Sequence, residues 1–528
     1  MSITLNPEQQ IVKQELLDFL KSSHKYHVLM GSAGTGKTTL ITEALKDISN
    51  KKIIFSATTN KAVAVLKIFS LLKNPRISCK TIHKLLNVRR QIDSEGRQQF
   101  TYMDVDYSSL DDVDIVIIDE ASMMNRYMLD QLDNATRGLK IKIIFVGDIN
   151  QLPPINENKS SVFSRGYPIS KLTTIERYKN DIVKYAGSII GQGRVQYKEL
   201  GDEVVFMKDK KDWLALYCRD VANSIILAYT NSTCRNYNYS VRKNLFDTNE
   251  KYVVSDKIVF NSPYSDDGNI GRFFTSEMVI IKSITKTVHS FQQLPMDNIL
   301  NLKIKMDKEI LVSAIKEIKP IDKEMCPICY DDVIDIMSQT RCGHLFCISC
   351  IKLWMEKNNC CPMCRCELND DKLTIKSSPE ASVILNELIA YTAHLQIKTM
   401  VLRVTKPNGL LGNSGIVIVD PDDEPRYREI YDYIESRLKK LKQYLDGKHD
   451  KFNRIIMLRI WQFFYKYYID LFADIGYGYC ITVHKSQGST YDNVYVDLKD
   501  IVRNNRNDAK ECVYTAVTRA ADTLKILK

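Results

Sequence analysis

The glycine-rich segment GSAGTGKT at residues 31–38 constrains the fold of this chain more than any other feature. It follows an apolar run at residues 26–30 that predicts a buried strand, and it leads into TTLITEALKDI, which predicts a helix. Between a strand and a helix, such glycines let backbone N–H groups curl around an anion, and the helix N-terminus adds partial positive charge. The segment therefore predicts an α/β domain with a phosphate-binding loop.

The sequence around this loop favours a parallel sheet. Short β-branched runs without alternation recur at residues 52–57, 115–118 and 142–146, as expected of strands that are buried on both faces. Helical patterns separate these runs, as parallel strands require. The whole chain has 528 residues, of which 44% are hydrophobic and 26% charged, so it has material for roughly three or four packed domains.

The loop and one acidic pair carry the residues that handle a magnesium nucleotide. Lys37 is suited to reach the β- and γ-phosphates, and the hydroxyl of Thr38 is suited to ligate magnesium. Asp119 and Glu120 end the apolar run VDIVII. A strand that stops in two carboxylates places the first near magnesium and the second near the attacking water. These residues together predict a phosphate-loop ATPase that uses Mg²⁺ with ATP.

Cysteine is concentrated in one part of the chain, because nine of the 14 cysteines lie between Cys326 and Cys366. Clustering of this kind favours a metal site over a disulfide framework, and no secretory signal is recognisable at the start of the sequence. Zinc takes four tetrahedral ligands, and paired Cys-x-x-Cys knuckles supply two at a fixed separation, so eight ligands predict two Zn²⁺ ions. The ligand pairs are Cys326 with Cys329, Cys342 with His344, Cys347 with Cys350, and Cys361 with Cys364.

Six segments in a fixed order give the chain a family resemblance. They are LNPEQ at 5–9, ATTNKAVAVL at 57–66, TIHKLL at 81–86, GDINQLPP at 147–154, ITVHKSQGST at 481–490 and YTAVTRA at 514–520. As a set they resemble the motifs of superfamily 1 helicases, most closely those of the RecD and Dda branch. The resemblance implies two RecA-like α/β domains and a monomeric motor that moves 5′→3′ on single-stranded nucleic acid, DNA rather than RNA.

The resemblance also implies roles for individual residues in the nucleotide cleft. Gln151 would sense the γ-phosphate, and Arg177 and Arg519 would act as arginine fingers from the second motor domain. An arginine that stabilises the transition state only in a closed cleft couples hydrolysis to domain closure. The sequence departs from the family where Tyr178 stands in place of the usual Gln. The implied nucleotide contacts are Gln9, which reads adenine in the family, and Gly31, Ser32, Ala33, Gly34, Thr35, Gly36, Lys37, Thr38, Thr39, Gln487 and Gly488.

A second set of residues is implied to lie on the single strand. Hydroxyl, amide and basic side chains bond phosphates and sugars without reading sequence, which suits a translocating motor. The set comprises Thr58, Asn60, Lys61, Thr81, His83, Thr482 and His484. Members of this branch also carry a pin hairpin, and VRRQIDSEGRQQFTYM at residues 88–103 predicts a hairpin there. Phe100 or Tyr102 would stack on a base; the alternative is an ordinary surface hairpin with its aromatic residues packed underneath.

The eight zinc ligands closely resemble the RING family, in which the first and third pairs hold one ion and the second and fourth hold the other. Cys360 and Cys366 are spare in this register. The resemblance implies that a ubiquitin-conjugating enzyme contacts Ile328, Trp354 and Pro362, and that Arg365 clamps the ubiquitin it carries. A zinc-stapled interaction module without ligase activity is the alternative, because small folds of this kind recur with several functions.

The order of these features predicts the domain layout. The expected parts are a first RecA-like domain at 1–168, a second at 169–250 and 476–528, a β module at 251–318 and 380–424, a RING finger at 319–379 and a helical arm at 425–475. The functional alternatives are a ubiquitin ligase that uses the motor for targeting, a superfamily 1 RNA helicase with a structural zinc module, and a zinc-stapled scaffold.

Charge and hydropathy bear on partners and location. The net charge of +10 suits a polyanionic partner, although a solvated basic surface explains it equally well. The most apolar stretch, residues 455–472, contains Arg459, Lys466 and Asp470, so it predicts a partly buried helix and no membrane span. We therefore expect an intracellular protein, in the cytoplasm or the nucleus. Because a RING finger inserted in a helicase of this branch is rare among cellular proteins, we expect a large DNA virus as the source.

Overall fold

The structure is a computed structural model of the chain. It describes the chain apart from residues 1–4, 47, 49, 60–61, 64–75, 94–95, 103–109, 111, 155–156, 158, 175–180, 193–200, 266–271, 294–315, 319–323, 330–331, 334–336, 340–341, 348–349, 352–353, 355–359, 367–378, 407–413, 446–450 and 504–507.

The N-terminal region forms a six-stranded sheet in which every neighbouring pair is parallel. In spatial order its strands are β3 (Ile77–Thr81), β2 (Ile53–Ala57), β6 (Ile115–Asp119), β7 (Lys142–Gly147), β1 (Tyr26–Gly31) and β8 (Ile169–Leu172). One face packs against α1 (Pro7–Lys21) and α2 (Lys37–Lys46), and the other packs against α4 (Ile82–Leu85) and α5 (Arg126–Ala135). Burial on both faces explains why these strands lack alternation.

The predicted domain boundary at residue 168 is wrong in one respect. Strand β8 was assigned to the second domain, but it pairs in parallel with β1 at the edge of the first sheet, with Val28 opposite Ile169. A four-residue strand carries too little sequence pattern to indicate which sheet it joins, and only its pairing with β1 decides this.

The second sheet has five parallel strands drawn from two separate parts of the chain. Its strands in spatial order are β23 (Cys480–Thr482), β10 (Ser224–Ala228), β24 (Tyr491–Asp497), β25 (Ala520–Leu527) and β9 (Val204–Met207). The helices around it are α6 (Asp181–Gln192), α7 (Lys210–Arg219), α8 (Asn231–Phe246), α15 (Val483–Ser486), α16 (Leu498–Val502) and α17 (Ala509–Val517). Two parallel sheets flanked by helices confirm the predicted α/β fold class.

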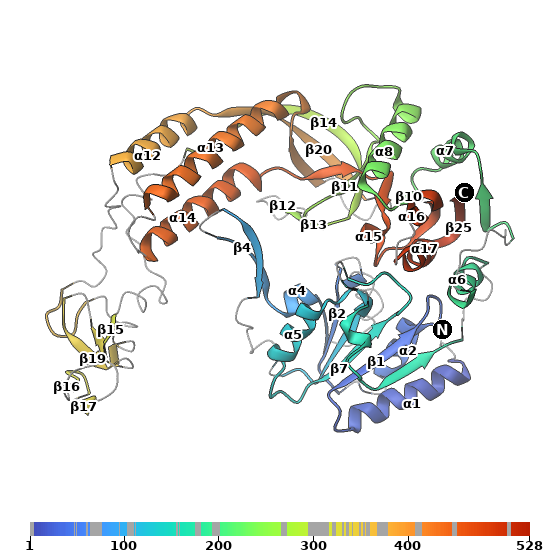
Figure 1. Ribbon diagram of the computed structural model, residues 1–528, viewed down its shortest axis with the longest axis horizontal. Helices are drawn as coiled ribbons and strands as arrows, with labels where there is room; N and C mark the ends of the chain where they lie inside the picture. Colours follow the sequence, from blue (N-terminus) through green and yellow to red (C-terminus); the bar gives the residue numbers. More distant parts are fainter. Residues whose placement is uncertain are drawn as a thin grey trace.

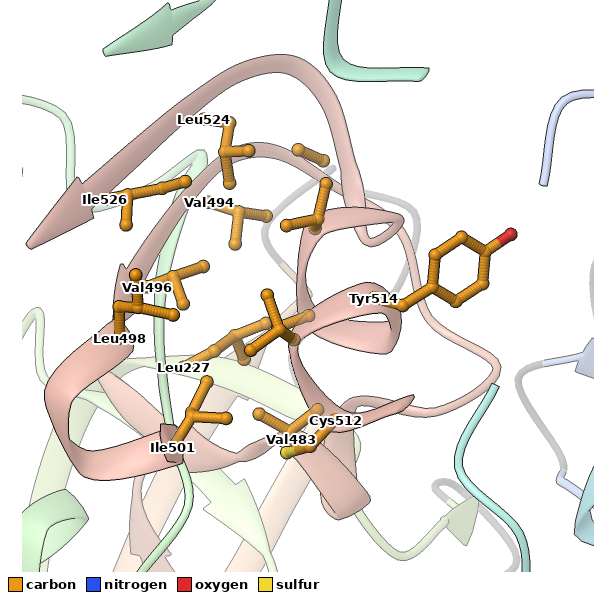
Figure 2. Packing of buried hydrophobic residues seen from close by; sticks show 14 of the residues in the cluster. Leu227, Val483, Val494, Val496, Leu498, Ile501, Cys512, Tyr514, Leu524 and Ile526 are labelled. Carbon is orange, nitrogen blue, oxygen red and sulfur yellow. The ribbon is translucent and has the colours of Figure 1, made fainter. Parts of the chain in front are cut away.

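Helix α17 packs on the second sheet through one of its faces. Figure 2 shows strand residues such as Val494 and Leu524 on one side of α17, in the same core cluster as Cys512, which lies beside Val483. The Tyr514 ring projects from the opposite side of the same helix, away from these strand residues. The apolar face of α17 therefore anchors the helix, and its other face is directed away from the sheet.

An antiparallel β module interrupts the second sheet in sequence. Its strands in spatial order are β21 (Ser414–Val419), β20 (Gln396–Thr405), β14 (Met278–Ser290), β11 (Lys257–Phe260) and β22 (Ile475–Tyr477), with a small hairpin of β12 (Tyr264–Ser265) and β13 (Arg272–Phe273). Burial alternates strictly along β21, as expected of a sheet with one solvated face. Residues 294–315, which were predicted to lie in this module, are outside the described residues.

Three helices form an arm that extends from the β module (Figure 1). They are α12 (Pro379–Thr392), α13 (Glu424–Leu445) and α14 (Lys451–Phe464), and a π-helical turn, Tyr465–Ile469, continues α14. The prediction that residues 380–424 belong wholly to the β module is wrong, because α12 packs on this arm through Leu385 and Leu388. No described helix is both long enough and apolar enough to span a membrane.

The cysteine-rich segment forms a separate small unit beyond the arm (Figure 1). Its strands are β15 (Lys316–Ile318), β16 (Glu324–Met325), β17 (Asp332–Val333), β18 (Met337–Gln339) and β19 (Leu345–Cys347). The described part of its core contains four buried residues, Cys326, Phe346, Ile351 and Cys361. A core this small cannot stabilise a fold without a further constraint, as metal binding supplies.

Candidate nucleotide, nucleic-acid and zinc sites

The phosphate loop joins β1 to α2 and has the backbone shape that an anion requires. Gly34 and Gly36 have φ angles of 80° and 78°, in the left-handed region that glycine adopts at low cost. The Nζ of Lys37 donates to the carbonyl oxygens of Gly31 at 2.6 Å and Ser32 at 3.0 Å. The lysine ammonium is thus held at the loop, and Thr38 and Thr39 follow it in the first turn of α2.

Gln9 lies against this loop. Its Nε2 donates to the carbonyl of Thr35 at 3.2 Å, and its Oε1 accepts from the backbone N–H of Asn6 at 3.1 Å. The side chain of Asn6 accepts in return from the backbone N–H of Gln9 at 2.7 Å. This reciprocal capping box fixes the start of α1 and orients the Gln9 amide toward the loop.

The acidic pair lies at the carboxyl end of β6, beside the loop. Asp119 accepts a 2.8 Å hydrogen bond from the backbone N–H of Glu120, whose φ of 52° turns the chain sharply after the strand. Burial raises the pKa of Asp119, the charge of Glu120 raises it further, and Lys37 opposes both effects. A divalent cation would stabilise the ionised form, so the carboxylate oxygens and the Thr38 hydroxyl fit a magnesium nucleotide.

Residues of the second sheet close this site from the other side. The hydroxyl of Tyr514 on α17 donates to Asp148 at 2.7 Å and accepts from the N–H of Ala33 at 2.9 Å. The hydroxyl of Thr515 accepts from the N–H of Leu152 at 2.9 Å. No role was predicted for Tyr514, Asp148 or Thr515, although all three lie within the motif segments. The loop after β7 thus connects the two sheets.

Gln151 and Gln487 lie at the same interface between the two domains. Gln151 is buried and lines a cavity of about 40 Å³ together with Glu511 of α17. In the part of the chain that the structure describes, the Oε1 of Gln151 and the Oε2 of Glu511 have no hydrogen-bond partner. Gln487 donates through Nε2 to the carbonyl of Leu152 at 3.1 Å. Gly488 approaches the first domain so closely that a Cβ would lie 2.7 Å from the Thr59 hydroxyl.

Arg519 is held just after α17 by neutral oxygens. It is 5% exposed, and its guanidinium donates to the carbonyls of Thr515 at 3.1 Å and Ser489 at 3.2 Å and to the Thr518 hydroxyl at 3.3 Å. Among the described residues it forms no ion pair. A buried cation bound only by neutral groups retains the capacity to bind an anion. Arg177, the other predicted arginine finger, lies outside the described residues.

Two short helices of the same design follow the edge strands of the two parallel sheets. Helix α4 follows β3 and α15 follows β23, and each opens with Thr, an aliphatic residue, His and Lys. Thr81 accepts from the N–H of Lys84 at 3.2 Å, and Thr482 accepts from that of Lys485 at 3.3 Å. The two sheets therefore present the same capped turn at equivalent positions.

The histidines of these two turns also correspond. Burial lowers the pKa of both His83 and His484, which favours neutral imidazoles that can donate a hydrogen bond without a fixed charge. The ring of His484 packs edge-on against Tyr229, with 5.6 Å between ring centroids. Thr58 donates to the Met123 sulfur at 3.2 Å. Asn60 and Lys61, both predicted to contact the strand, lie outside the described residues.

The predicted hairpin forms from β4 (Val88–Ile92) and β5 (Gln98–Tyr102), with Arg90 opposite Phe100. Its turn reaches the helical arm, where the hydroxyl of Tyr465 donates to the carbonyl of Gly96 at 2.9 Å (Figure 1). A Cβ on Gly96 would lie 2.7 Å from the Trp461 ring. The side chains of Phe100 and Tyr102 lie outside the described residues.

The thiols of the cysteine-rich unit gather into two clusters of metal-ligand type. In each cluster the ligand atoms lie within 4.8 Å of one another. The first contains Cys326, Cys329 and Cys350, and the second contains Cys342, His344, Cys361 and Cys364. The clusters join the first pair to the third and the second pair to the fourth, as expected of a cross-brace. The side chain of Cys347, the eighth predicted ligand, lies outside the described residues. Sulfur and imidazole donors at this spacing fit tetrahedral zinc.

The residues predicted to contact a ubiquitin-conjugating enzyme lie around the small core of this unit. Ile328 and Trp354 are half-buried against it, and the Nε1 of Trp354 donates to the carbonyl of Cys360 at 2.8 Å. Pro362 is also half-buried, whereas Arg365 is exposed and has a φ of 55°.

Three family models match the chain. They describe an AAA domain at residues 4–213, a UvrD-like helicase C-terminal domain at 477–527 and a C3HC4-type zinc finger (RING finger) at 326–364. Together they identify a superfamily 1 helicase with an inserted RING finger. The AAA-domain match covers the first parallel sheet and continues through β9 of the second sheet into α7. The UvrD-like match covers β23, β24 and β25 of the second sheet, and the zinc-finger match lies between the two.

Several individual proteins are similar to this helicase over all or part of the chain. A protein of Acanthamoeba polyphaga mimivirus is 27% identical over 98% of the chain and 99% of its own length, in keeping with the expected viral source. The ATP-dependent DNA helicase dda of Enterobacteria phage T4 is 29% identical over 46% of the chain and 59% of its own length. The ubiquitin-protein ligase CHFR of Mus musculus is 36% identical over 11% of the chain and 9% of its own length. A Pif1 helicase structure from Bacteroides, 13% identical, covers 99% of the chain and 92% of its own length at a TM-score of 0.43.

Proposed function

We propose that this helicase uses ATP hydrolysis to move 5′→3′ along single-stranded DNA as a monomer and to separate the duplex ahead of it. The observation that carries the proposal is the interface between the two domains that contain the parallel sheets. One side supplies Lys37 and the acidic pair, and the other supplies Arg519 and the Tyr514 bridge to Asp148. A nucleotide bound there would contact both sheets at once, so hydrolysis would change how they are held together.

The proposed DNA track runs over the two equivalent turns that begin with Thr81 and Thr482. Each turn has a threonine hydroxyl that caps the helix and a neutral histidine, both at the edge of the sheet. Two matched contact points on two sheets that move relative to one another suit stepwise translocation along a phosphate backbone. In this proposal the hairpin of β4 and β5 is the pin that splits the duplex, and Phe100 stacks on a base. The phage relative, named as a DNA helicase, supports DNA over RNA as the substrate.

An unwinding assay with four substrates tests this function. Duplexes of DNA and of RNA, each with either a 5′ or a 3′ single-stranded tail, are incubated with the protein, Mg²⁺ and ATP. We expect strand separation of the 5′-tailed DNA and little of the other three. Preferred unwinding of the 3′-tailed substrate would overturn the direction, and preferred unwinding of RNA would overturn the substrate. Lys37→Ala serves as the inactive control.

A second activity, as a ubiquitin ligase, is favoured by the RING unit. Ile328 and Trp354 leave part of their surface accessible beside the zinc clusters, where an apolar patch would hold a ubiquitin-conjugating enzyme. The similarity of this segment to a ubiquitin-protein ligase supports the proposal. We expect two zinc ions per chain and ubiquitin-chain formation with at least one of a panel of conjugating enzymes. Trp354→Ala should abolish transfer without releasing zinc. Two bound zinc ions with no transfer from any enzyme would leave a zinc-stapled scaffold.

A further inference from the structure

The second zinc cluster contains one more sulfur donor than the eight-ligand pattern requires. Cys366 lies outside that pattern, yet its Sγ is 3.2 Å from the Sγ of Cys364. The Cys366 thiol also lies within hydrogen-bonding reach of Cys342. Two members of the cluster are therefore neighbours of Cys366, which itself lies just outside the group of four whose ligand atoms are all within 4.8 Å of one another.

The backbone explains why Cys366 returns to the cluster. The N–H of Arg365 donates to the carbonyl of Cys361 at 2.9 Å, and the N–H of Cys361 donates to the carbonyl of Cys366 at 2.9 Å. Arg365 has a φ of 55°, in the left-handed region that non-glycine residues seldom adopt, so the chain reverses its direction there. The reversal brings the Cys366 thiol next to the thiol of Cys364.

Cys366 and His344 each contact two of the other three donors. The Sγ atoms of Cys342, Cys361 and Cys364 form a group in which Cys361 is within hydrogen-bonding reach of both others. The Nδ1 of His344 lies 3.3 Å from Cys342 and 3.7 Å from Cys361. Cys366 contacts the same group through Cys342 and Cys364. Zinc takes four ligands, so three sulfurs and either candidate would complete its tetrahedron.

We propose that Cys366 is an alternative ligand of the second zinc site, able to replace His344 and convert a Cys₃His site into a Cys₄ site. In the exchange the Cys366 thiol releases its proton to solvent, a sulfur–zinc bond forms and the bond from His344 breaks. The site would have four ligands before and after the exchange, and no oxidant or reductant is needed. The proposal is independent of whether the RING unit has ligase activity.

Metal stoichiometry in the full-length protein tests the proposal, with Cys360 as the matched control. Cys360 is the other cysteine outside the eight-ligand pattern in the same segment, and like Cys366 it is not one of the residues that form the two clusters. Among the described contacts, a thiol contact with a cluster member is present for Cys366 and not for Cys360. Four proteins are compared: the wild type, His344→Ala, and His344→Ala combined with either Cys366→Ser or Cys360→Ser. We expect about two zinc ions in the first two and in the Cys360→Ser combination, and about one in the Cys366→Ser combination.

Two further measurements identify the ligand directly. With Co²⁺ in place of zinc, the visible spectrum of His344→Ala should gain thiolate-to-metal absorption, because a fourth sulfur replaces nitrogen. Alkylation read by mass spectrometry should modify Cys366 in the wild-type protein with metal bound and spare it in His344→Ala. These measurements do not require the Cys366→Ser combination to fold. Equal metal loss with either second substitution, or Cys366 still alkylated in metal-loaded His344→Ala, would overturn the proposal.

Discussion

Tyr514 and Asp148 are 366 residues apart in the chain, yet the phenol hydroxyl donates a 2.7 Å hydrogen bond to the carboxylate. The same hydroxyl accepts from the N–H of Ala33 in the phosphate loop. One side chain of α17 thus connects the loop that binds nucleotide to the loop after β7 and to the second sheet. A movement of the phosphate loop on nucleotide binding would therefore shift Tyr514, and with it α17 of the second domain.

Replacement of Tyr514 by Phe tests this connection. The change removes the donor to Oδ2 of the buried Asp148, whose Oδ1 still accepts from Asn150. A hydrogen bond to a charged group contributes about 1.5–3 kcal/mol. We expect DNA-stimulated ATP turnover to fall at least tenfold. The affinity for nucleotide measured without DNA should change little. Tyr217→Phe is the matched control, because it removes a buried 3.0 Å hydrogen bond to the Tyr479 carbonyl far from the cleft. An equal loss of turnover in both variants would show that Tyr514 only stabilises the fold.

Lys37→Ala should abolish ATP hydrolysis while the protein stays folded. Among the described residues the Lys37 ammonium donates only to carbonyls of the loop, so its removal opens no cavity in the core. Lys46→Ala, on the exposed end of the same helix, should keep full activity. Turnover and thermal unfolding are measured for both, and DNA-stimulated hydrolysis by Lys37→Ala would contradict the role of the phosphate loop.

Glu120→Gln should separate binding from turnover. A glutamine of the same size keeps the shape of the site but cannot accept a proton from the attacking water. We expect nucleotide affinity within a few-fold of the wild type and almost no hydrolysis, measured with a fluorescent ATP analogue and by phosphate release. If affinity and hydrolysis fall together, Glu120 is a binding residue and not the water activator.

Arg519→Ala should lower the turnover number on the order of 10³-fold if the guanidinium stabilises the transition state. Its neighbours are two carbonyls and a hydroxyl, so the charge has no carboxylate to neutralise it among the described residues. Nucleotide affinity should change little. Arg126→Ala removes an exposed arginine on the first domain and should leave turnover unchanged. A turnover number of wild-type size in Arg519→Ala would make this arginine structural.

Gly96→Ala should weaken the contact between the hairpin and the helical arm. Its Cβ would meet the Trp461 ring at 2.7 Å, and its φ of 77° is costly for alanine. Gly138→Ala is a close control, since Gly138 has the same φ with no heavy atom within 4 Å of the added Cβ. We expect Gly96→Ala to reduce duplex unwinding severalfold more than DNA-stimulated ATPase, and Gly138→Ala to affect neither. Phe100→Ala should share the unwinding defect if the hairpin is a pin; equal loss of unwinding and translocation would make it an ordinary surface hairpin.

The local sites were predictable because their chemistry lies within short continuous segments. The phosphate loop at residues 31–38, the acidic pair at the end of β6, the hairpin and the clustered cysteines each depend on neighbours in sequence. Backbone conformation, capping and metal-ligand spacing act over a few residues, so the residue types themselves determine them. The α/β class followed for the same reason, from runs of apolar residues separated by helical patterns.

The contacts between distant segments were decided only by the tertiary structure. Nothing in the four residues of β8 distinguishes one parallel sheet from the other, and the pairing of β8 with β1 places it in the first. Helix α12 joins the arm because its apolar side chains pack there. The Tyr514 bond to Asp148 and the contact of Gly96 with the arm likewise join residues hundreds of positions apart. Such contacts depend on which surfaces the folded chain brings together, and no local pattern encodes that.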